Sequence, residues 1–408
     1  MKLKLNYKTI SISYFKDLDF PKTYAERHVF NPEQDMSYGS FEEDYSPEDL
    51  LSLLTEFDFD SIDKIVLTTG ISADDFKDEF SKLKSRIRGN SNTTNLNDKF
   101  KFYEKARNKF NVPLTFKVSD VGELKEILKQ YDNNSFILKP INGSGGLGFF
   151  KLNNDSLNQL NYIENMVENI SLENYIIQEY VEGENVSSSV LSTKDEAQNL
   201  INTRLITAND LGNDDYTYVG NIVPLDGNSL NLKKIARKGI ESSNLKKENS
   251  KKHAEKEIAE LNNEMKEASE DLIKEFKLIG SNGVDFKIDT QKNDLKIIEV
   301  NPRLQGTYQL CENALGINML EAHIKACEGE LIEIPKPKQY SVKKIVYAPK
   351  DVIIRDLKIN NLYDIPHNGE IIEKDNPIAT IICSNKDLDT AINDLMTANN
   401  KLNLALNI

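Results

Sequence analysis

The sequence predicts an α/β protein of two or three domains. Between residue 113 and about residue 330, short runs rich in aliphatic and aromatic residues alternate with segments whose apolar residues recur at helical spacing. A glycine-rich segment at 143–148 joins two of these runs, and two further runs at 283–289 and 295–303 are separated by a short polar loop. The length of 408 residues suits several domains, since a domain commonly contains about 100–200 residues.

The composition argues against several classes of function. Asp and Glu outnumber Lys and Arg by 65 to 51, so we expect no general affinity for nucleic acid or anionic lipid, although a local basic pocket for a phosphate is compatible with this charge. No apolar run reaches the length of about 18 residues that a membrane span needs, and the first residues do not resemble a signal peptide. Three separated cysteines (Cys311, Cys327 and Cys383) and four histidines favour neither a disulfide framework nor a zinc site, and they suit a reducing cytoplasm.

The sequence divides into three regions. Residues 1–95 read as a small α/β unit, with strands in TISISYF and KIVLTTGI, a helix at 47–57 and a polar boundary loop at 89–97. Residues 96–334 form the central region, which starts with a helix at 98–110. Residues 335–408 follow a Pro-rich turn and read as a cap of strand, turn, strand and a helix at 387–400.

The central region supplies most of the expected elements. The charged stretch from 244 to 277 is interpreted as a solvated helix with one apolar edge. Further helices are expected at 119–131 and 155–169. The expected strands are FILKP, FFKLN, YIIQEYV, SSSVLS, NTRLIT, GVDFKID and KIIEVN.

The glycine-rich segment is interpreted as a phosphate-binding hairpin. Residues 143–148 match GxGxxG, but FFKL follows, which is a strand pattern, whereas a dinucleotide fold needs a helix there and a Walker loop needs Gly-Lys-Ser/Thr. The preceding strand ends in Lys139. Backbone N–H groups of such a loop can cover phosphates, and a lysine can neutralise one as a point charge. The alternative is a plain glycine-rich turn with a surface lysine.

A second cluster of polar residues lies on the predicted hairpin of 283–289 and 295–303. A connecting loop of five or three residues sets Asp285 directly opposite Glu299 or Asn301, so three oxygen ligands converge on one side of the sheet. Oxygen ligands suit Mg²⁺, and Mn²⁺ is a second choice. Arg303 follows and can bind a phosphate or carboxylate through its planar fork. The alternative is a half-exposed polar face with surface ion pairs.

The remaining residues of this hairpin are assigned by alternation. Lys287 and Asp289 share the face of Asp285 and are interpreted as a solvated edge, and no general base is evident. Ile298 and Val300 are expected together on the opposite face.

These motifs in this order resemble the ATP-grasp superfamily, in the style of carbamoyl-phosphate synthetase, biotin carboxylase and amino-acid ligases. The tract IIEVNPR with an upstream VDF is the most specific part of the resemblance, which covers about 95–330 strongly. Residues 340–408 resemble the C-terminal cap of the biotin carboxylase branch more weakly. The quoted motifs are LNDK (96–99), FILKPINGSGGLG (136–148), IIQEYVEGENVSSSV (176–190), GVDFKID (283–289) and IIEVNPRLQGT (297–307).

The resemblance implies a fold and a set of site residues. The fold is a Rossmann-like N-terminal domain, a two-lobed ATP-grasp domain with lobes at about 96–180 and 181–334, and a small α/β cap. Lys99 and Lys139 would contact the ATP phosphates, Glu184 the ribose, and Arg303 a phosphate during catalysis. The implied loop residues are Gly143, Ser144, Gly145, Gly146 and Gly148; the implied adenine hinge is Glu179, Tyr180 and Val181; and the implied magnesium ligands are Asp285, Glu299 and Asn301.

Two departures from the family pattern concern the N-terminal region and the metal site. The chain begins near SISYFKDLDF, which resembles the second strand of the family's opening unit, so the first strand and helix are expected to be absent or shortened. Asp285 is shorter than the Glu or Gln also found at this position, so its distance to the metal is expected to differ.

The function implied is ATP-dependent ligation of a carboxylate to an amine or another nucleophile through an acyl phosphate. One alternative is a carboxylase that uses bicarbonate, which the cap favours. Another is a non-catalytic nucleotide-binding protein, and a kinase-like transfer is a smaller possibility. The substrates are not readable from the sequence, and a homodimer is the default expectation because twofold assemblies are the commonest.

Overall fold

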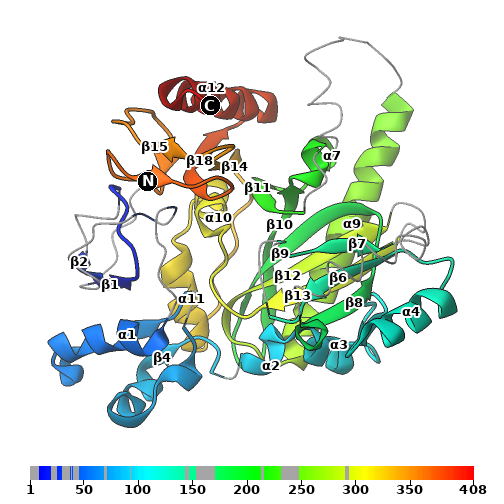
Figure 1. Cartoon of the computed structure of the whole chain (residues 1–408), viewed down its shortest axis with the longest axis horizontal. Helices are drawn as coiled ribbons and strands as arrows, with labels where there is room; N and C mark the ends of the chain where they lie inside the picture. Colours follow the sequence, from blue (N-terminus) through cyan, green and yellow to red (C-terminus); the bar gives the residue numbers. More distant parts are fainter. Residues whose placement is uncertain are drawn as a thin grey trace.

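The computed structural model describes residues 9–19, 25–29, 37, 39, 46–68, 71–91, 93–142, 146, 148–152, 171–212, 216–230, 248–289 and 294–408. The N-terminal region lies beside the C-terminal cap, and both lie to one side of the large central part of the molecule (Figure 1). Within the described residues, no helix combines the length and the apolar composition that crossing a membrane requires.

The N-terminal region contains two short pairs of parallel strands. β1 (Thr9–Ser13) pairs with β2 (Ala25–Val29), and β3 (Ile65–Val66) pairs with β4 (Ile87–Arg88). The expected helix at 47–57 forms as α1 (Pro47–Ser52), capped by Ser46, and continues as a 3₁₀ helix. Leu51, Phe76 and Leu83 are almost completely buried and form the centre of a separate small core. The 3₁₀ helices are η2 (Leu53–Glu56), η3 (Phe59–Ser61), η4 (Ala73–Asp75) and η5 (Asp78–Arg86).

A four-stranded antiparallel sheet forms the first central lobe. Its strand order is β5-β8-β6-β7, and the glycine-rich segment joins β6 to β7, as predicted. Leu124 and Leu128 of α4 pack on this sheet against Phe136 and Ile177. The helix expected at 155–169 lies outside the described residues. The elements are α2 (Thr94–Asn97), α3 (Lys99–Ala106), β5 (Thr115–Lys117), α4 (Val121–Gln130), β6 (Phe136–Pro140), β7 (Phe150–Leu152), η6 (Leu172–Asn174) and β8 (Tyr175–Glu179).

An eight-stranded sheet forms the second lobe and continues into the cap. Its order is β13-β12-β9-β10-β11-β14-β18-β16, so the predicted boundary at 334/335 is not a boundary of the sheet. The strands are β9 (Gly183–Ser192), β10 (Ala197–Thr207), β11 (Tyr218–Val223), β12 (Gly280–Asp289), β13 (Asp294–Asn301), β14 (Tyr340–Tyr347), β16 (Leu362–Tyr363) and β18 (Pro377–Asn385). A separate pair is formed by β15 (Val352–Ile353) and β17 (Ile371–Ile372).

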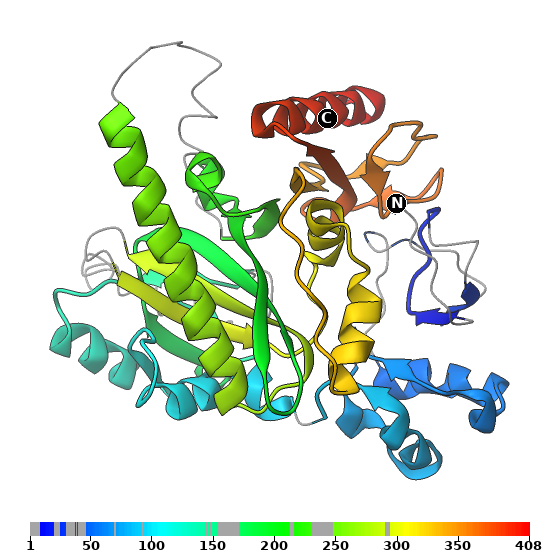
Figure 2. The same ribbon diagram turned by 180° about the vertical axis from the view of Figure 1, so that it is seen from behind.

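Helices cover this sheet (Figures 1 and 2). The long helix α9 packs against β9 and β10 through Met265, Leu272 and Ile273, so the expected solvated helix with one apolar edge is confirmed. The other elements are η7 (Asn209–Leu211), α7 (Gly227–Leu230), α9 (Glu248–Glu275), α10 (Tyr308–Leu315), α11 (Met319–Cys327) and α12 (Leu388–Leu406). Both large sheets turn one face toward the junction of the two lobes, and that junction holds the candidate site.

Candidate functional site

The hairpin of β12 and β13 sets the register of the site. Asp285 lies directly opposite Glu299, which is one of the two predicted registers, and Gly283 lies opposite Asn301. Asn301 donates a hydrogen bond from Nδ2 to Asp285 Oδ2 at 3.0 Å. On the other side of β12, Ser187 of β9 pairs with Asp285. Because directly opposed residues share a face, Ser187, Asp285 and Glu299 form one row across three strands.

A β-bulge at Ile298 corrects the face predicted for this residue. The pairing passes from Asp285–Glu299 to Phe286–Ile297, which leaves Ile298 as the extra residue. Ile297 and Val300 therefore both lie in the core behind the sheet, whereas Ile298 is only half-buried and lies outside that core. The expectation that Ile298 and Val300 share the apolar face is wrong, because simple alternation does not include the bulge.

The two opposed carboxylates repel each other. Burial and then the charge of Glu299 raise the pKa of Asp285 to about 7. The described residues contain no group of three or more His, Cys, Asp and Glu side chains arranged for a metal, so the predicted set of two carboxylates depends on the Asn301 amide oxygen as its third protein ligand.

Two buried lysines from the first lobe face these carboxylates. Lys99 is the first residue of α3 after the N-cap Asp98, is 6% exposed, and donates from Nζ to the Ile141 carbonyl at 3.5 Å. Lys139, at 2% exposure, donates to Gln178 Oε1 at 2.7 Å. The pKa of Lys139 is lowered to about 8. Burial is the main cause, the charge of Glu299 opposes this shift and the charge of Lys99 adds to it, so the three charges act on one another across the lobes. The interpretation of Lys139 as a surface lysine is excluded.

The end of the glycine-rich segment meets the chain just before β11. Gly146 and Gly148 have φ of +80° and +73°, in the left-handed region that favours glycine. A Cβ on Gly146 would lie 2.1 Å from the carbonyl oxygen of Tyr216, so only glycine fits there. Gly143, Ser144 and Gly145 lie outside the described residues, and their predicted contact with phosphates stays a prediction.

The predicted adenine hinge connects the two lobes. Glu179 forms an ion pair with Lys296 of β13 at 2.9 Å, and both side chains are 11% exposed. Tyr180 donates its backbone N–H to the Ser135 carbonyl at 2.8 Å, and Val181 is buried. The Glu179 carboxylate is therefore already bound by protein groups, and contact of this hinge with adenine stays a prediction.

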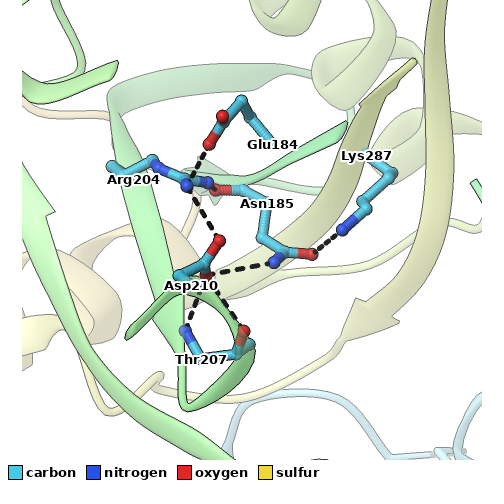
Figure 3. Close-up of polar contacts among 6 residues, drawn as sticks. All are labelled: Glu184, Asn185, Arg204, Thr207, Asp210 and Lys287. Atoms are coloured by element: carbon cyan, nitrogen blue, oxygen red, sulfur yellow. Dashed lines mark hydrogen bonds and ion pairs between the residues drawn. The ribbon is translucent and has the colours of Figure 1, made fainter. Parts of the chain in front are cut away.

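A polar network surrounds the start of β9 (Figure 3). Arg204, 2% exposed, forms ion pairs with Glu184 and with Asp210, the latter at 3.2 Å, and donates to the Asn185 carbonyl at 2.8 Å. Asn185 contacts Asp210 through Nδ2 at 3.5 Å and accepts from Lys287 Nζ at 3.0 Å.

The register places Glu184 and Asn185 on different faces. Asn185 lies opposite Lys287, in the same face as Asp285, whereas Glu184 lies opposite Ile288 and shares the face of the core. Asn185, which the sequence reasoning missed, is thus the residue of this pair on the site face, and ribose binding by Glu184 stays a prediction. Lys287 is half-buried and Asp289 is 6% exposed, so the expected solvated edge is wrong for both.

A cavity of about 420 Å³ adjoins the metal side of the site. Arg303, Glu299, Asn301 and Lys99 line it from the central region. The N-terminal region supplies the opposite wall through residues 87–90 and through Leu67, Thr68, Ile71, Ser72 and Asp75. The remaining lining residues are Leu96, Asn97, Thr93, Phe102, Asn142, Val300, Pro302 and His323.

Sequence reasoning also missed two residues that hold the cavity wall and the sheet face in place. His323 accepts from the Ser281 N–H at Nδ1, at 2.8 Å, and Nε2 lies 2.9 Å from the Arg88 carbonyl. Gln305 accepts from the Ser189 hydroxyl at 3.0 Å and covers Gly283, where a Cβ would lie 1.4 Å from Gln305 Nε2. Gln305 follows Arg303 by two residues, and this position in the motif could have indicated its role. No local sequence pattern indicates a role for His323.

Comparisons with known proteins agree with this architecture. The sequence model of the ATP-grasp domain matches residues 96–246, and that of the ATP-grasp family in the biosynthetic pathway with Ter operon matches residues 242–348. A curated relative is the uncharacterized protein MJ0776 of Methanocaldococcus jannaschii, 28% identical over 386 residues, which are 93% of this chain and 83% of that protein.

Two solved structures illustrate the fold. The biotin carboxylase domain of Hydrogenobacter thermophilus 2-oxoglutarate carboxylase, solved as a dimer with MgADP, ADP and bicarbonate, has a TM-score of 0.63 and 18% identity over 92% of this chain and 80% of that one. N5-carboxyaminoimidazole synthetase from Staphylococcus aureus, in complex with ADP, has a TM-score of 0.61 and 16% identity over 96% and 90% of the two chains. Residues 96–348 thus match two ATP-grasp family models, and the chain shares its fold with the biotin carboxylase domain and with N5-carboxyaminoimidazole synthetase.

Proposed function

We propose that the protein is an ATP-dependent carboxylate ligase that works through an acyl phosphate. The observation that carries this proposal is the meeting of opposite charges between the lobes: Asp285, Glu299 and Asn301 on the second-lobe sheet, opposite Lys99 and Lys139 from the first lobe. Two buried lysines beside two opposed carboxylates suit a polyanion that brings a divalent cation with it. Mg-ATP has both properties.

The donor set fits magnesium. Asp285, Glu299 and Asn301 offer oxygen ligands on one face. A divalent cation would relieve the repulsion from Glu299, which together with burial, the larger cause, raises the pKa of Asp285. When bound, Mg²⁺ would neutralise phosphate charge during transfer. Lys139 and Lys99 would hold the phosphates of ATP, and the loop that contains Gly146 would cover them.

The cavity is the place we assign to the carboxylate substrate. Its volume of about 420 Å³ lies within the range of roughly 300–1,000 Å³ of small-molecule sites. Arg303, for which no side-chain ion pair is found among the described residues, lines it next to Glu299 and can orient a carboxylate. Its mixture of apolar residues (Leu67, Ile71, Ile87) and polar ones suits a substrate larger than bicarbonate.

The reaction then takes two steps. A carboxylate oxygen attacks the γ-phosphorus of ATP, the bond from that phosphorus to the bridging oxygen breaks, and ADP leaves with the electron pair. An amine attacks the acyl carbon, phosphate leaves, and the nitrogen loses a proton to the solvent or to the departing phosphate. Positioning and charge neutralisation by Lys99, Lys139 and Arg303 supply the catalysis that this arrangement supports.

Release of ADP and phosphate from Mg-ATP tests the proposal, measured against a panel of amino acids, other small carboxylic acids, amines and bicarbonate. ADP release that needs one carboxylic acid and one amine supports the ligase. Phosphate transfer that stops at a stable phosphorylated product would instead identify a kinase.

A carboxylase that uses bicarbonate is the second candidate. It is favoured by the fold shared with the biotin carboxylase domain and with N5-carboxyaminoimidazole synthetase. ADP release that needs bicarbonate and an amine acceptor, with no requirement for another acid, would select it over the ligase.

A further inference from the structure

The cavity of about 420 Å³ contains one carboxylate that the proposed chemistry does not use. Among the described residues that line it, the acidic ones are Glu299, on the metal side, and Asp75, on the wall that the N-terminal region supplies. Glu299 is assigned to the metal, and its charge acts on Lys99 and Lys139. Asp75 has no ion-pair partner in the part of the chain that the structure describes, and its side chain is bound only by Ser72.

The chain around Asp75 holds its carboxylate in place. Ser72 caps the 3₁₀ helix η4, and Asp75 Oδ2 accepts from the Ser72 backbone N–H at 2.7 Å and from the Ser72 hydroxyl at 2.9 Å. Ala73 and Phe76 are buried, at 5% and 1% exposure, and Phe76 belongs to the N-terminal core. Both donors bind Oδ2, so Oδ1 keeps its capacity to accept from a ligand.

The other charged groups of the cavity define what this ligand carries. Arg303, which is assigned to the carboxylate substrate, also has no side-chain ion pair with a described residue. Arg88 forms an ion pair with Glu328, and both ring nitrogens of His323 are bound by backbone groups. One cation and one anion without protein partners therefore line the same cavity, which suits a carboxylate together with an ammonium group.

The proposed reaction brings an amine into this cavity, because the amine must reach the acyl carbon formed beside Arg303. An alkylamine, like a lysine side chain, is protonated near neutral pH, so Lys99 and Arg303 repel it and Asp75 attracts it. We propose that Asp75 binds the ammonium form of an alkylamine nucleophile at the N-terminal wall of the cavity. One proton then leaves to the solvent before the nitrogen attacks. The inference rests on the proposed ligase function and adds the chemical class of its second substrate.

Trapping with hydroxylamine separates the binding of the ammonium group from the phosphorylation step. Hydroxylamine is largely uncharged at pH 8 and converts an acyl phosphate into a hydroxamate. The full-length protein is incubated with Mg-ATP, each carboxylic acid of the panel and either hydroxylamine or a protonated amine (ammonium chloride, methylamine or ethanolamine). ADP, hydroxamate and amide are then measured.

Asp75→Asn keeps an oxygen that can accept from Ser72 and removes the negative charge. It should lower kcat/KM for the protonated amine by about tenfold or more, the effect of one charge-assisted hydrogen bond. The value for hydroxylamine should stay within about twofold. Asp74→Asn is the matched control, because Asp74 precedes Asp75 in η4, is exposed and does not line the cavity; it should change neither value.

The possible results separate this inference from the proposed function. Wild-type protein that forms neither ADP nor hydroxamate with any acid would overturn the ligase and this inference with it. Wild-type hydroxamate formation without any amide product would overturn this inference alone. The same holds if Asp75→Asn leaves kcat/KM for the amine unchanged, lowers the value for hydroxylamine equally, or raises only the KM of the carboxylic acid.

A second measurement decides the question if thermal melting shows that Asp75→Asn does not fold. Trimethylammonium chloride carries the charge of an alkylammonium ion but cannot form a stable amide. It should inhibit hydroxamate formation by the wild-type protein more strongly than potassium chloride at the same ionic strength, because it occupies the site beside Asp75. Equal inhibition by the two salts would refute the assignment.

Discussion

His323 connects the N-terminal region to the second lobe, and its replacement tests how this wall of the cavity is held. The backbone N–H of Ser281 can only donate, so Nδ1 of His323 must accept, and the ring proton on Nε2 is donated to the Arg88 carbonyl. The ring is therefore held neutral, and burial lowers the pKa of His323. Cys327 Sγ, another titratable group, lies 3.8 Å from Nε2.

The expected magnitude follows from the two hydrogen bonds. His323→Phe keeps a ring but leaves the Ser281 N–H and the Arg88 carbonyl without their partner, and each buried unpaired group costs about 1–3 kcal/mol. We expect about 2–6 kcal/mol of destabilisation. At about 2–4 °C per kcal/mol for a cooperative unit of about 150–250 residues, the size of the second lobe together with the cap, the melting temperature at pH 8 should fall by at least about 4 °C.

The pH dependence gives the sharper test. Because the folded-state pKa of His323 is lowered, the unfolded chain takes up the proton first, and stability is lost as the pH falls below about 6.5. Because a single proton is involved, proton linkage limits the loss in the free energy of unfolding to about 1.4 kcal/mol per pH unit. Between pH 8 and 5.5 the wild-type melting temperature should therefore fall by about 2–5 °C more than that of His323→Phe. The matched control is His367→Phe, which removes a histidine bonded to the Lys16 carbonyl. Equal falls in wild type and His323→Phe would refute the buried neutral ring.

Three further substitutions test the site. Glu299→Gln should abolish ADP release in the enzymatic assay while the circular dichroism spectrum stays unchanged; near-wild-type turnover would contradict the metal assignment. Gly146→Ala should reduce turnover by at least tenfold, because its Cβ would lie 2.1 Å from the Tyr216 carbonyl, whereas Gly329→Ala has a similar positive φ with nothing within 4 Å and should keep its activity. Lys139→Met should raise the melting temperature of the ligand-free protein, since a buried charge is removed, and should weaken ATP binding in titrations; a lowered melting temperature would contradict the burial argument.

Local sequence patterns predicted the strands and the register of the site well. β6 coincides with FILKP, and the short loop between GVDFKID and LKIIEVN restricted Asp285 to two possible partners, of which Glu299 is the one observed. Period-two alternation and loop length are local properties, so a single sequence carries them.

Other features depend on residues far apart in the chain. The bulge at Ile298, the burial of Lys287 and Asp289, and the face of Glu184 follow from the pairing of β12 with both β9 and β13, which alternation along one strand cannot reveal. Likewise, the cap strands β14 and β18 extend the second-lobe sheet. A boundary predicted from a Pro-rich turn cannot show that hydrogen bonding continues across it.

The site concentrates interactions that are unfavourable without a ligand. Asp285 opposes Glu299, Lys287 opposes Lys296, and Lys139 is buried with Lys99 as a like-charged neighbour. Lys99 and Lys139 approach Glu299 from the first lobe, so one ligand that carries phosphates and a divalent cation would compensate these lysines and the two carboxylates together. Since a ligand that binds only the folded state stabilises it by mass action, Mg-ATP should raise the melting temperature far more than Mg²⁺ or ATP alone. That cooperation between metal and nucleotide follows from the charge arrangement and does not depend on which carboxylate the cavity accepts.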